Sequence, residues 1–178
     1  RLAANRAPGT VNQYLASLSH ACSVAVTEWA WLEASPLRRV RRLREPRGRV
    51  RFLSEEERTR LLQACRASHN RALYPVVVLA LATGARKMEL LQLTWRDVNL
   101  PGATLTLEHT KNRERRTLPL ADLALAEVQT LAKVRRIDTS LLFPRADGRQ
   151  PIDLRYAWAQ ALRAAQIADC RFHDLRHS

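Results

Sequence analysis

The stretch from Ala72 to Ala82 restricts most strongly how this chain can fold, because nearly every residue in it is apolar. A helix without a polar face cannot lie on the surface of a globular domain. The stretch is also too short to cross a bilayer, which takes about 20 residues per helix. We therefore expect a buried helix at the centre of a domain, with Pro75 in its first turn and Thr83-Gly84 at its end.

The patterns around this helix predict a mainly α fold with a small antiparallel β-sheet, of the α+β class. Ser54 and Glu57 form a capping box that opens one helix, and a short helix follows Arg86. Alternating apolar residues predict a hairpin, and helical spacing returns after it. The predicted strands are 104–107 and 116–120, with 98–100 as a candidate third, and the later helices are 122–136 and one capped by Asp153.

The N-terminal part has the pattern of a separate helical piece. Apolar residues recur at helical spacing from Thr10–Gln13, which has the form of a capping box, to about residue 34. A single helix cannot bury its own apolar face. We therefore divide the chain into residues 1–44, the end of a helical domain, residues 45–51, a basic linker, and residues 52–178, a second domain.

Positive charge is the main feature of the composition. The chain has 30 Lys and Arg against 17 Asp and Glu, a formal net charge of +13, and only three of the basic residues are lysine. Arginines at high density repel one another unless a polyanion compensates them. The segment 38–51 is therefore expected to bind a polyanion through eight arginines: Arg38, Arg39, Arg41, Arg42, Arg44, Arg47, Arg49 and Arg51.

Composition also excludes several classes of protein. A hydrophobic content of 46% is too high for a disordered basic tail. Cys22, Cys65 and Cys170 form no CxxC pair, which argues against a disulfide framework or a zinc ribbon. We see no secretory signal or membrane span, so we expect a cytoplasmic protein in a reducing compartment. The chain begins at Arg1 rather than Met, which suggests an excerpt from a longer product.

Two basic side chains stand at positions suited to chemistry. Arg86 follows a glycine break and precedes a short helix, with Glu89 one turn on to orient it. A guanidinium beside a helix N-terminus makes a strong anion site. Lys111 lies at the tip of the predicted hairpin, and an ammonium can donate a proton whereas an arginine in practice cannot. The hairpin also carries Arg113, Arg115 and Arg116.

A third cluster lies near the end of the chain, where His173, Arg176 and His177 share one face of a predicted helix. Two interpretations compete. The pattern HDxxH is similar to the zinc-binding HExxH helix, although Arg176 would place a cation between the ligands and no third ligand follows. Alternatively, Arg176 binds a phosphate oxygen while His173 moves a proton.

Taken together, the three clusters suit phosphodiester chemistry without a metal or other cofactor. Arg86 and Arg176 would stabilise negative charge on the phosphate oxygens, and Lys111 or His173 would supply a proton to the leaving oxygen. None of the three clusters contains a nucleophile for such a reaction.

The chain resembles the tyrosine recombinases, the phage-integrase family of site-specific DNA recombinases. Residues 83–98, TGARKMELLQLTWRDV, look like that family's first arginine box. Thr110-Lys111-Asn112 falls where its hairpin lysine belongs, and residues 173–177, HDLRH, look like its HxxRH box. The N-terminal helix and residues 36–40 look like the end of its core-binding domain and its interdomain linker.

This resemblance implies an enzyme that clamps double-stranded DNA and cuts and rejoins its strands through a 3′-phosphotyrosyl intermediate. Arg86 and Arg176 would bind the scissile phosphate, Lys111 would protonate the leaving 5′ oxygen, and His173 would assist, with Glu89 and His177 in support. The basic residues of the linker and the hairpin would contact the DNA backbone. The family also implies a homotetramer on DNA and an association with the nucleoid.

The family's nucleophilic tyrosine lies beyond the HxxRH box, whereas Tyr14, Tyr74 and Tyr156 lie before it. A chain ending at Ser178 is therefore expected to form no covalent complex with a suicide DNA substrate. The sequence also leaves open that this chain, in the absence of DNA, is a monomer. Two alternatives stay open: a non-catalytic DNA-binding remnant that regulates recombination, and an HDxxH metallohydrolase. A tyrosine encoded shortly downstream would argue against the first, and zinc analysis of the purified protein tests the second.

Overall fold

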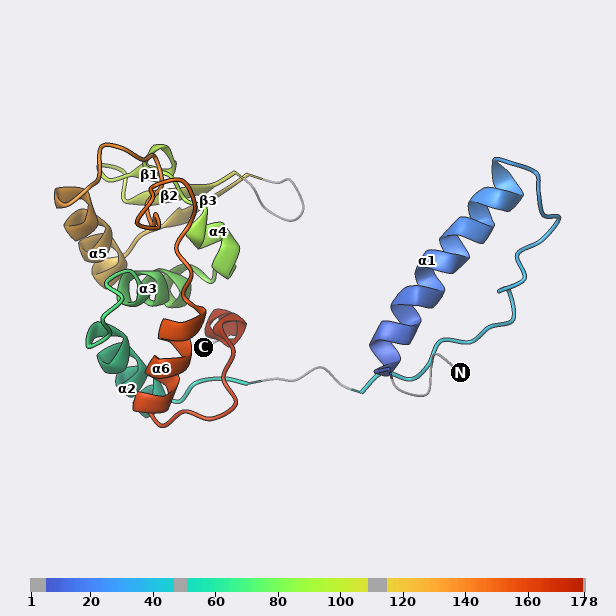
Figure 1. The fold of residues 1–178 in the computed structure, drawn as a ribbon, viewed down its shortest axis with the longest axis horizontal. Coiled ribbons are helices and arrows are strands. Elements are labelled where there is room, and N and C mark those ends of the chain that lie inside the picture. Colours follow the sequence, from blue (N-terminus) through green and yellow to red (C-terminus); the bar gives the residue numbers. More distant parts are fainter. Residues whose placement is uncertain (1–5, 47–50, 109–114, 178) are drawn as a thin grey trace. The chain divides into compact units, whose positions relative to one another are not determined.

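The computed structural model describes residues 6–46, 51–108 and 115–177. The chain forms two compact units, Arg1–Arg49 and Val50–Ser178, each of which is described by itself. Helix α1 (Pro8–Thr27) belongs to the first unit, and the other helices and the sheet belong to the second (Figure 1). In the described part of the chain, no helix is both long and apolar enough to span a membrane.

Helix α1 differs from its prediction at both ends. The predicted capping box at Thr10–Gln13 is wrong, because Ala7 is the N-cap and makes no side-chain cap. The helix starts instead at Pro8, where a missing N–H costs nothing. It ends at Thr27, because the chain turns through Ala30 at φ 51° and the N–H of Trp31 donates to the carbonyl of Ala25.

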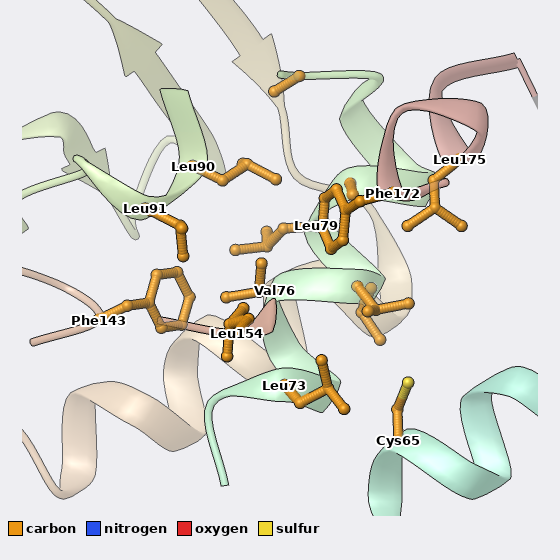
Figure 2. Packing of buried hydrophobic residues seen from close by; sticks show 14 of the residues in the cluster. Cys65, Leu73, Val76, Leu79, Leu90, Leu91, Phe143, Leu154, Phe172 and Leu175 are labelled. Atoms are coloured by element: carbon orange, nitrogen blue, oxygen red, sulfur yellow. The ribbon is translucent and has the colours of Figure 1, made fainter. Parts of the chain in front are cut away.

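The second unit is built around the buried helix that the apolar stretch predicts. Helix α3 (Leu73–Thr83) packs against its neighbours on several sides, and Pro75 lies in its first turn as expected. Figure 2 shows Val76 and Leu79 of this helix in the hydrophobic core, together with Leu90 and Phe143. The helices around it are α2 (Glu55–Arg66), α4 (Lys87–Leu91), α5 (Asp122–Lys133), α6 (Arg155–Ala164) and the 3₁₀ helix η3 (Phe172–His177).

The predicted small antiparallel sheet is confirmed. Its strands β1 (Val98–Asn99), β2 (Thr104–Leu107) and β3 (Arg116–Pro119) pair in the order β1-β2-β3, and the short 3₁₀ helix η2 (Trp95–Asp97) leads into β1. Leu105 and Leu107 of β2 are buried, so one face of the sheet covers the core. The mainly α fold with one small sheet is therefore the observed class.

Helices α6 and η3 differ from their predictions, α6 in its N-cap residue and η3 in its helix type. Asp153 accepts a hydrogen bond from the N–H of Arg155 at 2.9 Å, but Leu154 is the N-cap of α6. Residues 172–177 form a 3₁₀ helix, in which side chains three apart align. The spacing of His173 and Arg176 therefore places these two residues on one face of the 3₁₀ helix.

Candidate functional site

Arg86 stands at the junction between the buried helix α3 and the short helix α4. Gly84 ends α3 in the left-handed conformation, at φ 61° and ψ 18°, which glycine adopts without strain. The chain then extends through Arg86, which is the N-cap of α4. This turn sets the half-buried Arg86 side chain at the helix N-terminus, where the sequence predicts an anion site.

Glu89 orients this arginine through two contacts. One of its carboxylate oxygens accepts a hydrogen bond from the backbone N–H of Arg86 at 2.8 Å, and the other pairs with the guanidinium Nη1 at 2.7 Å. The Glu89 side chain is only 5% exposed, so the ion pair is shielded from water on the carboxylate side. The supporting role that the sequence suggests for Glu89 thus has a definite geometry.

The same carboxylate also binds the hairpin. Nη2 of Arg116, the first residue of β3, lies 3.3 Å from Oε2 of Glu89. Arg116 is half-buried, and its Nε is buried without a hydrogen-bond partner in the described part of the chain. Arg116 therefore connects the hairpin to the Arg86 turn instead of lying free on the surface, a role that sequence reasoning missed because the two residues are distant in the chain.

Charge balance around Glu89 affects its ionisation. Burial by itself would raise the pKa of this carboxyl, but the hydrogen bonds from Arg86 and the nearby charges of Arg86 and Arg116 outweigh burial and hold its pKa below the usual value. Glu89 therefore stays ionised at neutral pH, with one carboxylate between two guanidinium groups.

Arg176 is brought to the same place by the packing of η3 against α3. A Cβ atom added at Gly84 would lie 3.7 Å from Cγ of Arg176, so the arginine stem passes directly over the glycine that precedes the Arg86 turn. Leu175 and Phe172 are buried in the core and anchor the short helix (Figure 2). The two arginine motifs, far apart in the sequence, therefore meet at the end of α3.

His173 and Lys87 lie at the edge of this junction. His173 is exposed on η3, next to the buried Phe172. The ammonium of Lys87 lies 5.8 Å from the centre of the Phe172 ring, which is a cation–π distance. Arg86, Lys87 and Arg176 therefore bring three basic side chains to the segments that meet at the end of α3.

Other predicted site residues fall outside what the structure describes. These are Arg47, Arg49, Lys111 and Arg113, together with the side chain of His177. The segment with Lys111 joins the paired ends of β2 and β3, where Leu107 faces Arg116 across the ladder. Because Arg116 binds Glu89, the base of this hairpin is tied to the Arg86 turn.

The structure divides the remaining arginines, which the sequence predicts to bind a polyanion, into two groups. Arg51 is engaged within the protein, since its Nη2 lies 2.5 Å from Glu57, a member of the observed capping box of α2. The others are exposed and form no ion pair with the described residues: Arg38, Arg39, Arg41, Arg42, Arg44 and Arg115.

The three tyrosines lie on helices α1, α3 and α6. Tyr14 and Tyr156 are 62% and 78% exposed. The Tyr74 hydroxyl accepts a hydrogen bond from Arg66 at 3.0 Å, and that guanidinium also lies over its ring. As for metals, the described residues contain no group of three or more His, Cys, Asp or Glu side chains placed to hold an ion.

Comparison with known proteins places this geometry in a family. The model of the phage integrase family matches residues 51–178, more than two thirds of the chain. This chain belongs to the phage integrase family. The match covers all of the second unit except Val50, including the two arginine motifs that meet at the end of α3, and it confirms the resemblance that those motifs indicate.

Relatives within the phage integrase family include the shufflon-specific DNA recombinase of Escherichia coli, which is 33% identical over 168 residues, 94% of this chain and 42% of that protein. A putative integrase of Pseudomonas phage Pf1 is 37% identical over 115 residues, 65% of this chain and 34% of that protein. The chain thus spans well under half the length of these two curated relatives.

Solved structures of integrases share the fold. The catalytic domain of bacteriophage HP1 integrase has a TM-score of 0.54 at 29% identity, over 73% of this chain and 69% of that one. The Tn1549 transposon integrase in complex with transposon right end DNA has a TM-score of 0.82 at 17% identity, over 97% of this chain and 66% of that one. At 17% identity the second similarity concerns the fold alone.

The Glu89 carboxylate gives a testable prediction for stability. Glu89→Gln keeps the shape but removes the charge between two half-buried guanidinium groups, and we expect it to lower the free energy of unfolding at pH 7 by about 1–3 kcal/mol. Because the folded pKa is depressed, the stability that Glu89 contributes is present above its unfolded pKa and is lost as pH falls through the folded value. Urea unfolding at pH 7 and at a series of lower pH values measures both effects.

Glu108→Gln is the matched control, because Glu108 lines the same cleft of about 470 Å³ as Glu89 but is exposed. We expect the stability difference between wild type and Glu89→Gln to shrink as the pH falls and the wild-type carboxyl becomes protonated. Equal stability of the Glu89→Gln and Glu108→Gln variants at pH 7 would contradict the role given to the buried carboxylate.

Proposed function

We propose that this chain is part of a site-specific DNA recombinase that cleaves and rejoins strands through a 3′-phosphotyrosyl intermediate, without a metal. The observation that carries the proposal is the contact between Gly84 and Arg176, which brings the two arginine motifs together at one helix end. Membership of the phage integrase family and the names of its relatives, a DNA recombinase among them, support the same activity.

Each residue of the cluster has a proposed role in the reaction. Arg86 and Arg176 bind nonbridging oxygens of the scissile phosphate and stabilise the charge that develops there. Lys111 donates a proton to the leaving 5′ oxygen, and His173 assists proton transfer. Glu89 is a positioning residue, because it holds Arg86 by two contacts while Arg116 ties the hairpin to it.

The proposed partner is double-stranded DNA. Residues 1–44 would be the C-terminal part of a core-binding domain and residues 45–51 a basic interdomain linker, and both this part and the catalytic residues 52–178 would contact the DNA. The exposed arginines at 38–44 and Arg115 supply cations for the DNA backbone, whereas Arg51 and Arg116 are held by carboxylates. A homotetramer on DNA and association with the nucleoid belong to the same proposal for the whole protein.

Binding of DNA by the 178-residue chain tests this proposal. If about six phosphates are contacted, log K should fall with log[salt] at a slope near −5, since each neutralised phosphate contributes about 0.9. Fluorescence anisotropy of a labelled duplex over a salt series gives the slope. Arg41→Gln together with Arg42→Gln should make it shallower by up to about 2.

The control for this series is Arg163→Gln with Arg155→Gln, which removes two exposed arginines from helix α6, of which Arg155 pairs with Asp153 at 2.7 Å. We expect this pair to change the slope much less, because α6 is not proposed to face the duplex. An affinity that does not depend on salt would rule out the proposed phosphate contacts.

A non-catalytic, DNA-binding role is the second candidate, and the positions of the tyrosines favour it for these residues. Tyr74 is engaged by Arg66, and Tyr14 and Tyr156 lie on helices α1 and α6, away from the motifs that carry Arg86 and Arg176 in the sequence. Both candidates predict DNA binding. They differ in covalent trapping on a nicked suicide duplex, which the complete gene product should show if it is a recombinase and should lack if it is a remnant.

A further inference from the structure

The first unit contains a segment that turns back along its own helix. After α1 and the turn at Ala30, residues 37–45 return beside the helix in the opposite direction (Figure 1). Leu37, Val40 and Arg42 line a small cavity together with Leu15, Ala16 and Ser19 of α1. Farther along, Leu43 and Glu45 reach the first turns of the same helix. We call residues 37–45 the arginine strap.

Asn12 attaches this strap to the helix. Its Nδ2 donates to the carbonyl of Leu43 at 2.9 Å, and its Oδ1 accepts from the N–H of Leu43 at 2.8 Å, so both backbone groups of one strap residue are bound. Nδ2 also donates to Oε1 of Glu45 at 2.6 Å. Asn12 is only 7% exposed, although half of the residues of α1 are exposed to solvent. Only a side chain with both a donor and an acceptor can make this set of bonds.

A second contact holds the end of the strap at the helix N-terminus. A Cβ atom added at Gly9 would lie 3.3 Å from Oε2 of Glu45, so glycine leaves room for the carboxylate beside the first turn. Helix α1 has no acidic residue in that turn and no side-chain cap. Glu45 therefore supplies the negative charge that a helix N-terminus favours, from a position outside the helix.

The strap displays a dense row of cations. Arg38, Arg39, Arg41, Arg42 and Arg44 are all exposed, and no described carboxylate forms an ion pair with them. Five like charges in seven residues would repel one another and favour many conformations of a free segment. The hydrogen bonds of Asn12 oppose this by holding the backbone at Leu43, between Arg42 and Arg44.

We infer that Asn12 is a positioning residue that keeps the arginine strap ordered along α1, so that its five guanidinium groups are presented together to the phosphates of double-stranded DNA. This inference rests on the proposed function and deepens it, because it assigns the phosphate contacts outside the catalytic unit to an ordered surface and not to a flexible linker. A segment already held in its bound path loses less conformational entropy when it binds.

The variant Asn12→Asp tests the inference within the 178-residue chain. The substitution keeps the shape but puts a carboxylate oxygen against the Leu43 carbonyl and against Glu45, so the attachment is lost. It also adds one negative charge, and Gln13→Glu is the matched control because Gln13 is the exposed neighbour on the same helix. A third variant changes all five strap arginines to glutamine.

Two measurements are made on each variant. Relative to Gln13→Glu, Asn12→Asp should weaken binding of a labelled duplex at about 0.1 M salt by roughly tenfold, and trypsin should cut after the strap arginines at least about fivefold faster. In the five-glutamine background, Asn12→Asp should weaken DNA binding no more than Gln13→Glu does, because the ordered cations are gone.

The outcomes distinguish failure of the role inferred for Asn12 from failure of the proposed function. Faster tryptic cleavage with DNA affinity equal to that of Gln13→Glu would overturn the inference and leave the proposed function intact. Equal rates of tryptic cleavage of the Asn12→Asp and Gln13→Glu variants would show that Asn12 does not hold the strap. If trypsin still cut Asn12→Asp faster than Gln13→Glu but the wild-type chain did not bind duplex DNA, the proposed function would instead be overturned.

Discussion

Replacement of Arg176 by alanine is expected to lower the rate of DNA strand cleavage by the complete gene product by about 10²–10³-fold, the usual cost of removing one donor that stabilises transition-state charge. The stem of Arg176 passes over Gly84, beside the turn that holds Arg86, and we propose that the two arginines bind one phosphate. DNA affinity should fall only severalfold, because one phosphate contact among many is lost. Covalent trapping on a nicked suicide duplex measures the cleavage rate, and anisotropy measures the affinity.

The control for this prediction is Arg163→Ala, which removes an exposed arginine from helix α6. It should leave cleavage within about twofold of wild type, because a lone surface charge contributes little. If the DNA affinity and the cleavage rate of Arg176→Ala fell by the same factor, this arginine would bind DNA without acting on the reacting phosphate. That result would contradict the proposed site.

The largest effect on stability is expected from Phe143→Ala. Phe143 is 1% exposed and lies in the cluster that also holds Leu91 and Leu154 (Figure 2). Truncation of a fully buried phenylalanine removes its transfer free energy and leaves a cavity, which together cost about 3–5 kcal/mol. Since domains of this size are stable by about 5–15 kcal/mol, the variant should be close to unfolding. Urea denaturation followed by circular dichroism measures the change.

Phe52→Ala is the natural comparison, because Phe52 belongs to the same unit but is 56% exposed. Its removal should cost less than about 1 kcal/mol, since little apolar surface is returned to water. If both variants lost the same stability, the burial described for Phe143 would not hold the second unit together.

Local patterns predicted most elements of the second unit. The apolar run at Ala72–Ala82 specified α3, because a helix without a polar face must be buried. The capping box at Ser54 and the left-handed Gly84 marked helix ends, since both act over a few residues. Strand alternation likewise placed β2 and β3, because side chains alternate between the two faces of a sheet.

The predictions failed where a chain turn or packing against the core competes with local pattern. Helix α1 ends at Thr27 because the chain reverses at Ala30, although helical spacing continues beyond that point. Residues 172–177 wind as a 3₁₀ helix because Phe172 and Leu175 are drawn into the core of the unit. Propensity and spacing are weak priors that tertiary packing can override.

By itself the sequence determined the fold class, the family and the kinds of side chain available for chemistry, because motif composition and hydrophobic period are local properties. Only the tertiary structure decided which of these side chains meet. The packing of η3 on α3 sets Arg176 over Gly84, Glu89 joins Arg86 to Arg116, and Asn12 binds Leu43 across 31 positions of sequence. These contacts depend on how buried elements fill a common core and on where a distant donor finds its acceptor, and no local pattern records either.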